Sequence, residues 1–323
     1  MRTSRLVPTF PRAVAWLVVV LTAGCAGRPY KYGRFHPEGV EAPPLVVEHG
    51  GPDEHLDRLK SIVQFPKRLL SFGRNQDEES TDESERQVAQ YLEKNDLTDV
   101  YVSVNDYDPD DQWRRLKEND RVAPVWKYTL GAASVVGYTL LPGRVFGKDN
   151  YNPFTNTLSL NSPHPNRGLY EAAWAKDVHT KSHVGSYVAF SYLPGLSLAR
   201  EAKKTDDVVG YLQAEENWEL EKQAYPELYA QLGSRSAGLA SPFVSGIASP
   251  VIGLGARIVG HTTGRVVAGQ RAKEIERIQT DRLNVEIDEW LAEVAREESA
   301  EIQLVGGEDD PSESNSTRNS RND

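Results

Sequence analysis

The chain of 323 residues contains a single cysteine, Cys25, and this constrains its fold more than any other feature. No disulfide can form within the chain, and no cysteine-ligated metal site can hold it together. About 250 residues lie between two compositionally biased ends, which is enough to bury the core of one sizeable domain or two small ones.

The residues before Cys25 have the layout of an export signal. Three arginines precede an apolar stretch, residues 13–21, which is too short to span a bilayer. The words "LTAGC" that follow resemble the lipobox of bacterial lipoproteins. This resemblance implies cleavage after residue 24, a diacylglycerol and a fatty acyl chain such as palmitate on Cys25, and, with Ala26 next, an outer-membrane location. The alternative is a plain secretory signal that ends on a chance cysteine.

Both ends of the mature chain are predicted to lie outside the folded body. Removing residues 1–24 removes Arg2, Arg5 and Arg12, so the formal net charge goes from −10 to −13. This acidity argues against nucleic acid and anionic lipid headgroups as partners. Residues 25–52 are rich in Pro and Gly and are expected to tether the body to the lipid. Residues 306–323 are polar and acidic and are expected to be disordered.

The body, residues 53–305, is predicted to be α+β and mainly helical. Apolar spacing and capping residues predict helices at 56–66, 80–94, 108–117, 218–232 and 281–298, the last with an apolar stripe. A further helix is expected from residue 185, divided at Pro194 and Gly195. Alternation and β-branched residues predict strands at 100–104, 134–146 and 152–162. Helices, a few strands and then helices again are typical of an α+β fold.

A glycine-rich stretch, residues 237–269, has glycines spaced seven apart at Gly246, Gly253 and Gly260. Small residues at helical spacing let two helix backbones approach closely. Pro242 and Pro250 interrupt the stretch, so we expect a tightly packed internal helical hairpin. The alternative is a membrane-embedded or self-associating segment.

One short motif, "LYEAAWAKD" at residues 169–177, bears on chemistry. Zinc peptidases of the HExxH type place two histidines four residues apart on one helical face, with a glutamate as general base beside the first. Here Glu171 stands in the position of the base, and Tyr170 and Trp174 stand in the two histidine positions. Taken alone, two aromatic residues four apart on a helix are usually core.

The context of this motif resembles a bacterial lipoprotein family with a zincin-like core. Its members carry "YNPYTNT", a strand and "LHEAGHAKD" in succession; this chain has "YNPFTNT" at 151–157, followed by the motif. The resemblance implies a small β-sheet packed on the motif helix. It also implies a third metal ligand from the next helix, for which Glu201 is the natural match.

A zinc site at this motif would lack the protein ligands that it needs. Catalytic zinc needs three protein ligands and one open position, and neither Tyr170 nor Trp174 replaces a neutral nitrogen donor at neutral pH. A rival pair, His179 and His183, has the spacing of metal ligands, but Thr180 stands where the base would be.

We therefore expect a membrane-anchored lipoprotein with a degenerate peptidase-like domain and no cofactor. It would be a pseudoenzyme that acts by binding or scaffolding a protein partner at the cell envelope. The alternative is an active metal-dependent hydrolase, zinc-loaded, with a site rebuilt from Glu171, His179, His183 and Glu201. In a third interpretation the likeness is accidental, and the chain is an anchored helical module.

Overall fold

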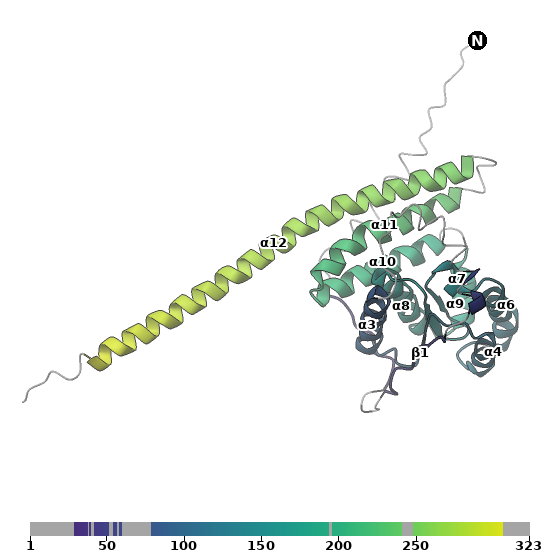
Figure 1. The fold of residues 1–323 in the computed structure, drawn as a ribbon, viewed down its shortest axis with the longest axis horizontal. Helices are drawn as coiled ribbons and strands as arrows, with labels where there is room; N and C mark the ends of the chain where they lie inside the picture. The colour runs from purple at the N-terminus through teal and green to yellow at the C-terminus, as the bar shows by residue number, and fades with distance from the viewer. Residues whose placement is uncertain are drawn as a thin grey trace, which may run out of the picture. The chain divides into compact units, whose positions relative to one another are not determined.

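The computed structural model describes residues 29–37, 39, 42–51, 54–56, 58–59, 79–193, 196–240 and 248–305. The chain divides into two compact units, residues 1–269 and 270–323. Figure 1 shows the sheet and its helices in the first unit; the described part of the second is the C-terminal part of one long helix. The expected α+β, mainly helical class is confirmed. The predicted signal peptide, Cys25 and the C-terminal tail lie outside the described residues.

Four short strands form one mixed sheet in the order β1-β2-β4-β3. They are β1 (Val47–His49), β2 (Tyr101–Val104), β3 (Asn150–Asn152) and β4 (Thr157–Leu160). β1, β2 and β4 are parallel, whereas β3 is antiparallel to β4 and lies at the sheet edge, with Tyr151 opposite Leu158. The strand predicted at 152–162 is thus a hairpin whose turn includes Asn156 in the left-handed region, at φ 51°. The strand predicted at 100–104 is confirmed as β2.

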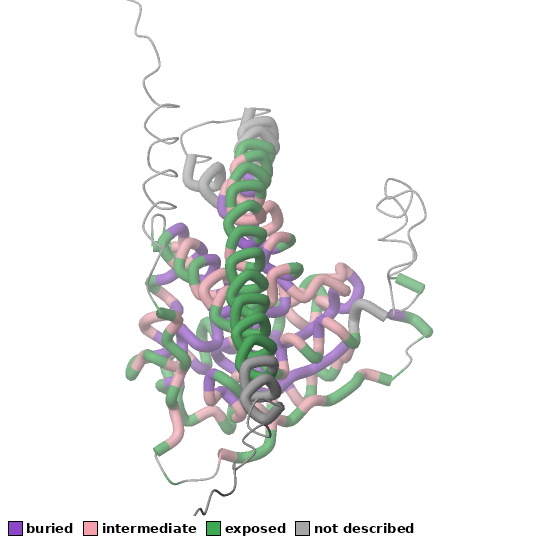
Figure 2. Tube along the Cα trace, turned by 90° about the vertical axis from the view of Figure 1, so that its left-hand side faces the viewer, coloured by how far each residue is buried: buried purple, intermediate pink, exposed green. Residues whose placement is uncertain are grey.

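Helix α8 lies at the centre of the first unit. It packs on α3, α10, α11, β3 and β4, which share one apolar core with it, and Figure 2 shows that the buried trace lies inside the body. Gly168 permits the close approach of α3, since a Cβ there would lie 2.6 Å from Val88 Cγ2. The helices are α3 (Glu79–Lys94), α4 (Pro109–Glu118), α5 (Pro124–Trp126), the π-helix η1 (Lys127–Gly131), α6 (Ala132–Leu140), α7 (Gly143–Phe146), α8 (Pro165–His179), α9 (Val184–Ser191), α10 (Leu196–Ala214), α11 (Trp218–Ala240) and α12 (Ala248–Val305).

The strand predicted at 134–146 is wrong, because this segment forms α6 and α7. Gly131 and Val135, four residues apart, are buried, whereas Val136 and Leu140 are exposed. A single inward position per turn fits a helix lying on α4, where a Cβ at residue 131 would approach Leu116 Cδ1 to 2.6 Å. Helical packing therefore outweighs the β-propensity of the valines and threonine.

The tether predicted at 25–52 is also corrected where the structure describes it. Residues 47–49 are strand β1, and residues 29–37 lie against the body. The hydroxyl of Tyr30 donates to Asn95 at 3.0 Å and accepts a hydrogen bond from Lys176 Nζ at 2.7 Å. The prediction of a tether rested on the Pro- and Gly-rich composition and did not weigh the aromatic residues Tyr30 and Phe35, which pack against the core.

Two features of α12 bear on the sequence predictions. Gly260 and Gly264 lie directly against the α11 backbone, since Cβ atoms there would stand 2.2 and 2.5 Å from carbonyl oxygens of Tyr229 and Tyr225. In the second unit, the predicted apolar stripe is helical but exposed, at Leu283, Ile287, Trp290, Leu291 and Val294. Among the described helices, none combines the length and apolarity needed to cross a membrane.

Candidate functional site

The motif helix α8 turns Tyr170 and Trp174 into the core of the first unit. The helix begins with Pro165 at its first turn, where a missing N–H costs nothing. Residues four apart share a helical face, and the two aromatic residues are only 3% and 4% exposed. The Trp174 ring lies 5.8 Å from the Tyr187 ring, centroid to centroid. The two positions that would hold imidazoles in an HExxH helix are thus filled by packed aromatic side chains.

Glu201, the expected third-ligand match, does face Tyr170 from the neighbouring helix α10. Its carboxylate is 1% exposed and accepts a hydrogen bond from the Tyr170 hydroxyl. Arg200 binds the other oxygen, with Nη2 at 2.7 Å from Oε1. Burial raises the pKa of the Glu201 carboxyl, but Lys204, the Tyr170 hydrogen bond and Arg200 together lower it below its ordinary value. Glu201 is therefore held as a carboxylate.

Lys204, which sequence reasoning missed, connects the two acidic residues. Its Nζ lies 3.0 Å from Glu171 Oε1 and 3.8 Å from Glu201 Oε2, and the side chain is 5% exposed. The same nitrogen stands 3.9 Å from the centroid of the Tyr170 ring, in cation–π geometry. The signal in the sequence was a lysine one helical turn after Glu201, a spacing that ordinarily marks a solvent-exposed ion pair.

Glu171 points from α8 towards the open edge of the sheet. Its Oε2 accepts a hydrogen bond of 3.3 Å from the backbone N–H of Tyr151 in edge strand β3, and its Oε1 binds Lys204. Its neighbours on α8 have other partners, since the Tyr170 hydroxyl donates to Glu201. Lys176 binds Tyr30 and Asp207 instead. Glu171 remains 18% exposed, so this carboxylate reaches solvent.

A cavity of about 610 Å³ follows β3 on the side of Glu171. It is lined by Glu171, residues 148–154, part of α6 and Tyr192, among others. Asp149 lies in it, and burial, to which the charge of Glu171 adds, raises the pKa of the Asp149 carboxyl to about 6 despite hydrogen bonds from Ser162 and Asn161. Asn161, 5% exposed, donates from Nδ2 to Lys148 O at 3.0 Å, while its Oδ1 has no hydrogen-bond partner among the described residues. No motif or spacing in the sequence pointed to Asp149 or Asn161.

The side chains around Glu171 do not fit a zinc ion. Two carboxylates are present, but both imidazole positions are aromatic, and the Lys204 ammonium lies between the carboxylates and would repel a second cation. Within the described part of the chain, no group of three or more His, Cys, Asp or Glu side chains has the geometry to hold a metal.

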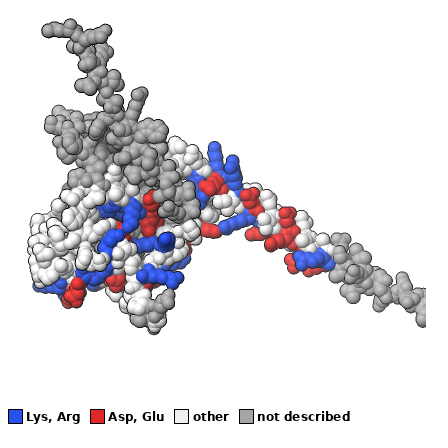
Figure 3. All heavy atoms as spheres, turned by 180° about the vertical axis from the view of Figure 1, so that it is seen from behind, with Lys and Arg blue, Asp and Glu red and all other residues white. Residues whose placement is uncertain are grey.

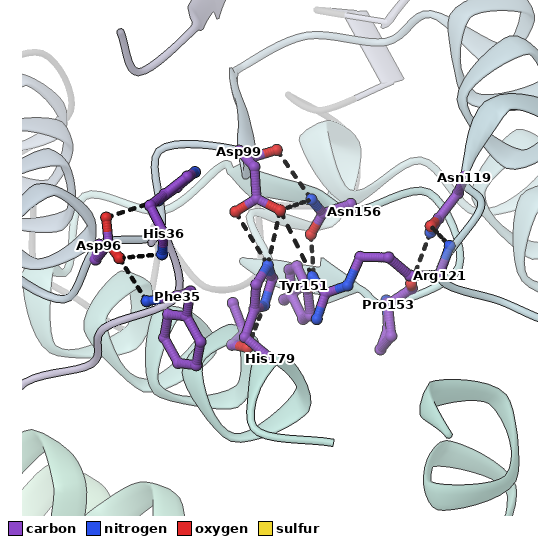
Figure 4. Close-up of polar contacts among 11 residues, drawn as sticks. Phe35, His36, Asp96, Asp99, Asn119, Arg121, Tyr151, Pro153, Asn156 and His179 are labelled. Atoms are coloured by element: carbon purple, nitrogen blue, oxygen red, sulfur yellow. Dashed lines mark hydrogen bonds and ion pairs between the residues drawn. The ribbon is translucent and has the colours of Figure 1, made fainter. Parts of the chain in front are cut away.

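The rival pair, His179 and His183, is not brought together with Glu171. His179 ends α8, two turns beyond Glu171, and its Nε2 faces Asp99 at 3.0 Å while Nδ1 faces Ala175 O at 2.7 Å (Figure 4). His183 is exposed and precedes α9. Burial raises the pKa of the Asp99 carboxyl, but His179, Arg121 and Asn156 lower it below its ordinary value. His179 thus joins a polar cluster that fixes the end of α8.

A scan of the chain against protein-family models gave no match, and searches of curated proteins and of solved structures gave none either. What the site can do therefore follows from its own side chains.

Proposed function

We propose that this protein is a lipoprotein of the bacterial envelope, anchored through Cys25, with a zincin-like domain that binds a protein partner and cleaves nothing. The observation that carries this proposal is the position of Lys204. Its ammonium stands within 3.0 Å of Glu171 and 3.8 Å of Glu201, the base and third-ligand positions that the resemblance implies around a metal. The Lys204 ammonium supplies, between these two carboxylates, the positive charge that a bound metal ion would otherwise supply.

The arrangement of β3 supports the zincin-like part of the proposal. The resemblance implies a small β-sheet packed on the motif helix, and both β3 and β4 contact α8. β3 is an antiparallel edge strand, and its Tyr151 N–H reaches Glu171 on α8. The Lys204 ammonium and the two packed aromatic rings then explain why such a core would be inert towards peptide bonds.

The cavity along β3 supports binding of an extended peptide. Edge strands offer unpaired backbone groups that an added strand can use, and the cavity runs beside residues 148–154. Asn161, whose Oδ1 lacks a partner within the described chain, also lines this cavity. Glu171 already accepts from Tyr151, so a bound peptide would share or displace this weak, 3.3 Å hydrogen bond.

The rebuilt hydrolase has less support from the geometry. Its four residues would have to converge, yet His179 is engaged with Asp99, whereas Glu171 and Glu201 share Lys204. Eight residues along α8, at about 1.5 Å rise each, separate Glu171 from His179.

Metal analysis of variants tests the proposal. The natural protein should contain no stoichiometric zinc after purification in zinc-containing buffer. Tyr170→His with Trp174→His should bind zinc poorly, because Lys204 still occupies the carboxylates. Adding Lys204→Ala to these two changes should raise zinc affinity at least about tenfold. Stoichiometric zinc in the natural protein that is lost in His179→Ala or His183→Ala would refute the proposal and favour the hydrolase.

A further inference from the structure

Two segments far apart in the sequence carry almost no charge. Residues 122–143 contain one ionisable cation, Lys127, whose Nζ donates to Lys117 O at 2.9 Å, and residues 184–199 contain no Asp, Glu, Lys or Arg. The whole chain is 26% charged, so about ten charged residues would be expected in two segments of this combined length. With one charged residue between them, the two segments must form either core or an unusually apolar surface.

The structure places much of both segments on the surface. In the first segment, Leu140 is 72% exposed and Leu141 65% exposed, at the turn between α6 and α7. In the second, Phe190 and Tyr192 are 58% and 62% exposed, at the end of α9. The exposed apolar side chains of the two segments, called here the apolar face, are Val125, Tyr128, Leu130, Val136, Leu140, Leu141, Phe190, Tyr192, Leu193 and Leu196.

The two segments adjoin each other. The Trp126 indole N–H donates to Ser186 Oγ at 3.1 Å, and a Cβ at Gly185 would lie 2.5 Å from the indole ring. Leu141 and Tyr192 line the same cavity. In Figure 3, the side of the body that carries α6 and α9 shows few charged side chains. Contiguous exposed apolar surface of this kind marks a place of contact with a membrane or another molecule.

We infer that the apolar face makes a reversible contact with a lipid bilayer, an inference that rests on the lipid anchor of the proposed function. Only three residues separate Cys25 from Pro29, where the described chain begins, and Tyr30 is already docked on the body through Asn95. Four chain steps span at most about 15 Å. An acylated Cys25 would therefore hold the body close to the bilayer surface.

The chemistry of the apolar face fits a bilayer. Leucines at helix turns can enter the acyl region, and aromatic side chains such as Tyr128, Phe190 and Tyr192 suit the headgroup boundary. Because neither segment contains an acidic residue, nothing within them repels a zwitterionic or an anionic headgroup. The contact would orient the body rather than anchor it, since no described helix is long and apolar enough to span the bilayer.

Vesicle binding by the unlipidated protein tests this inference separately from the anchor. The mature chain, residues 25–323 with Cys25→Ser, is mixed with phosphatidylcholine vesicles, and the bound fraction is measured by flotation. We expect measurable binding that changes less than about twofold when salt is raised about tenfold, because apolar insertion is not screened. Leu140→Glu with Leu141→Glu should weaken the partition coefficient about tenfold or more, as should Phe190→Ser with Tyr192→Ser in a separate variant, with unchanged circular dichroism.

The matched control replaces equally exposed apolar residues elsewhere. Leu283 and Trp290 of α12 are 55% and 61% exposed, and Leu283→Glu with Trp290→Glu should leave vesicle binding unchanged. The inference is overturned if the Cys25→Ser protein does not bind vesicles, if only the α12 variant loses binding, or if the apolar-face variants bind as well as the parent. Retention of Cys25→Ser in the membrane fraction after a carbonate wash, which removes a reversible contact, would instead count against the proposed anchor.

Discussion

Replacing Lys204 with methionine removes the cation between Glu171 and Glu201 while keeping the length of the side chain. Lys204 and Glu201 are 5% and 1% exposed, so water solvates the Glu201 carboxylate poorly, whereas Glu171, 18% exposed, is solvated in part. Glu201 keeps Arg200 as a partner, but among the described residues Glu171 keeps only the long hydrogen bond from Tyr151. Removing one member of a buried ion pair costs about 3–5 kcal/mol, and the remaining partners place Lys204→Met near the low end, about 3 kcal/mol. For a body of this size, that is a fall in Tm of about 6–12 °C.

Thermal and denaturant unfolding followed by circular dichroism measures this loss. Lys203→Met is the matched control: Lys203 is adjacent in α10 and also binds a carboxylate, that of Asp177, but it is 55% exposed, so its loss should cost less than about 1 kcal/mol. Adding Glu171→Gln to Lys204→Met should restore at least about 1 kcal/mol, since an amide needs no cation. The reasoning is wrong if Lys204→Met costs no more than the control, or if the effects of the two changes at 171 and 204 simply add.

Four further predictions follow from the same structure. Trp174→Ala should destabilise the protein by about 3–5 kcal/mol in urea unfolding, the range for deleting a large buried aromatic side chain; a loss below about 1 kcal/mol would show that the ring is not core. Gly260→Ala should cost about 1–3 kcal/mol because its Cβ meets α11 backbone, whereas Gly269→Ala, with open space around it, should be neutral or stabilising. Because the pKa of Asp149 is raised in the folded state, stability should fall by at most about 3 kcal/mol as the pH rises from about 4 to above 6. Asp149→Asn should lack this component, and identical pH profiles would contradict the raised pKa. Cys25→Ser should release the protein from the membrane fraction after a carbonate wash, and retention would mean that another segment is the anchor.

Where local signals and tertiary packing agreed, the sequence was a sufficient guide. The helices predicted at 80–94 and 108–117 begin within one residue of the starts of α3 and α4, and alternating valines mark β2. These signals act within one turn or one strand, so no distant contact is needed to interpret them. The segment at 134–146 was predicted wrongly as a strand. The packing of Gly131 and Val135 on α4 outweighs the β-propensity of its β-branched residues.

By itself the sequence determined the mainly helical α+β class, the inward-facing aromatic pair on the motif helix, and Glu201 as the acidic residue that meets it. The first two follow from helical periodicity and from residue chemistry, whereas Glu201 was expected only from the resemblance to the lipoprotein family. Only the tertiary structure decided that Lys204 lies between the two glutamates, that Glu171 turns to the sheet edge, and that Tyr30 docks a segment expected to be a free tether. The physical reason is that long side chains choose partners across elements, and the free energy of burying a charge depends on what surrounds it in space rather than on its neighbours in the chain.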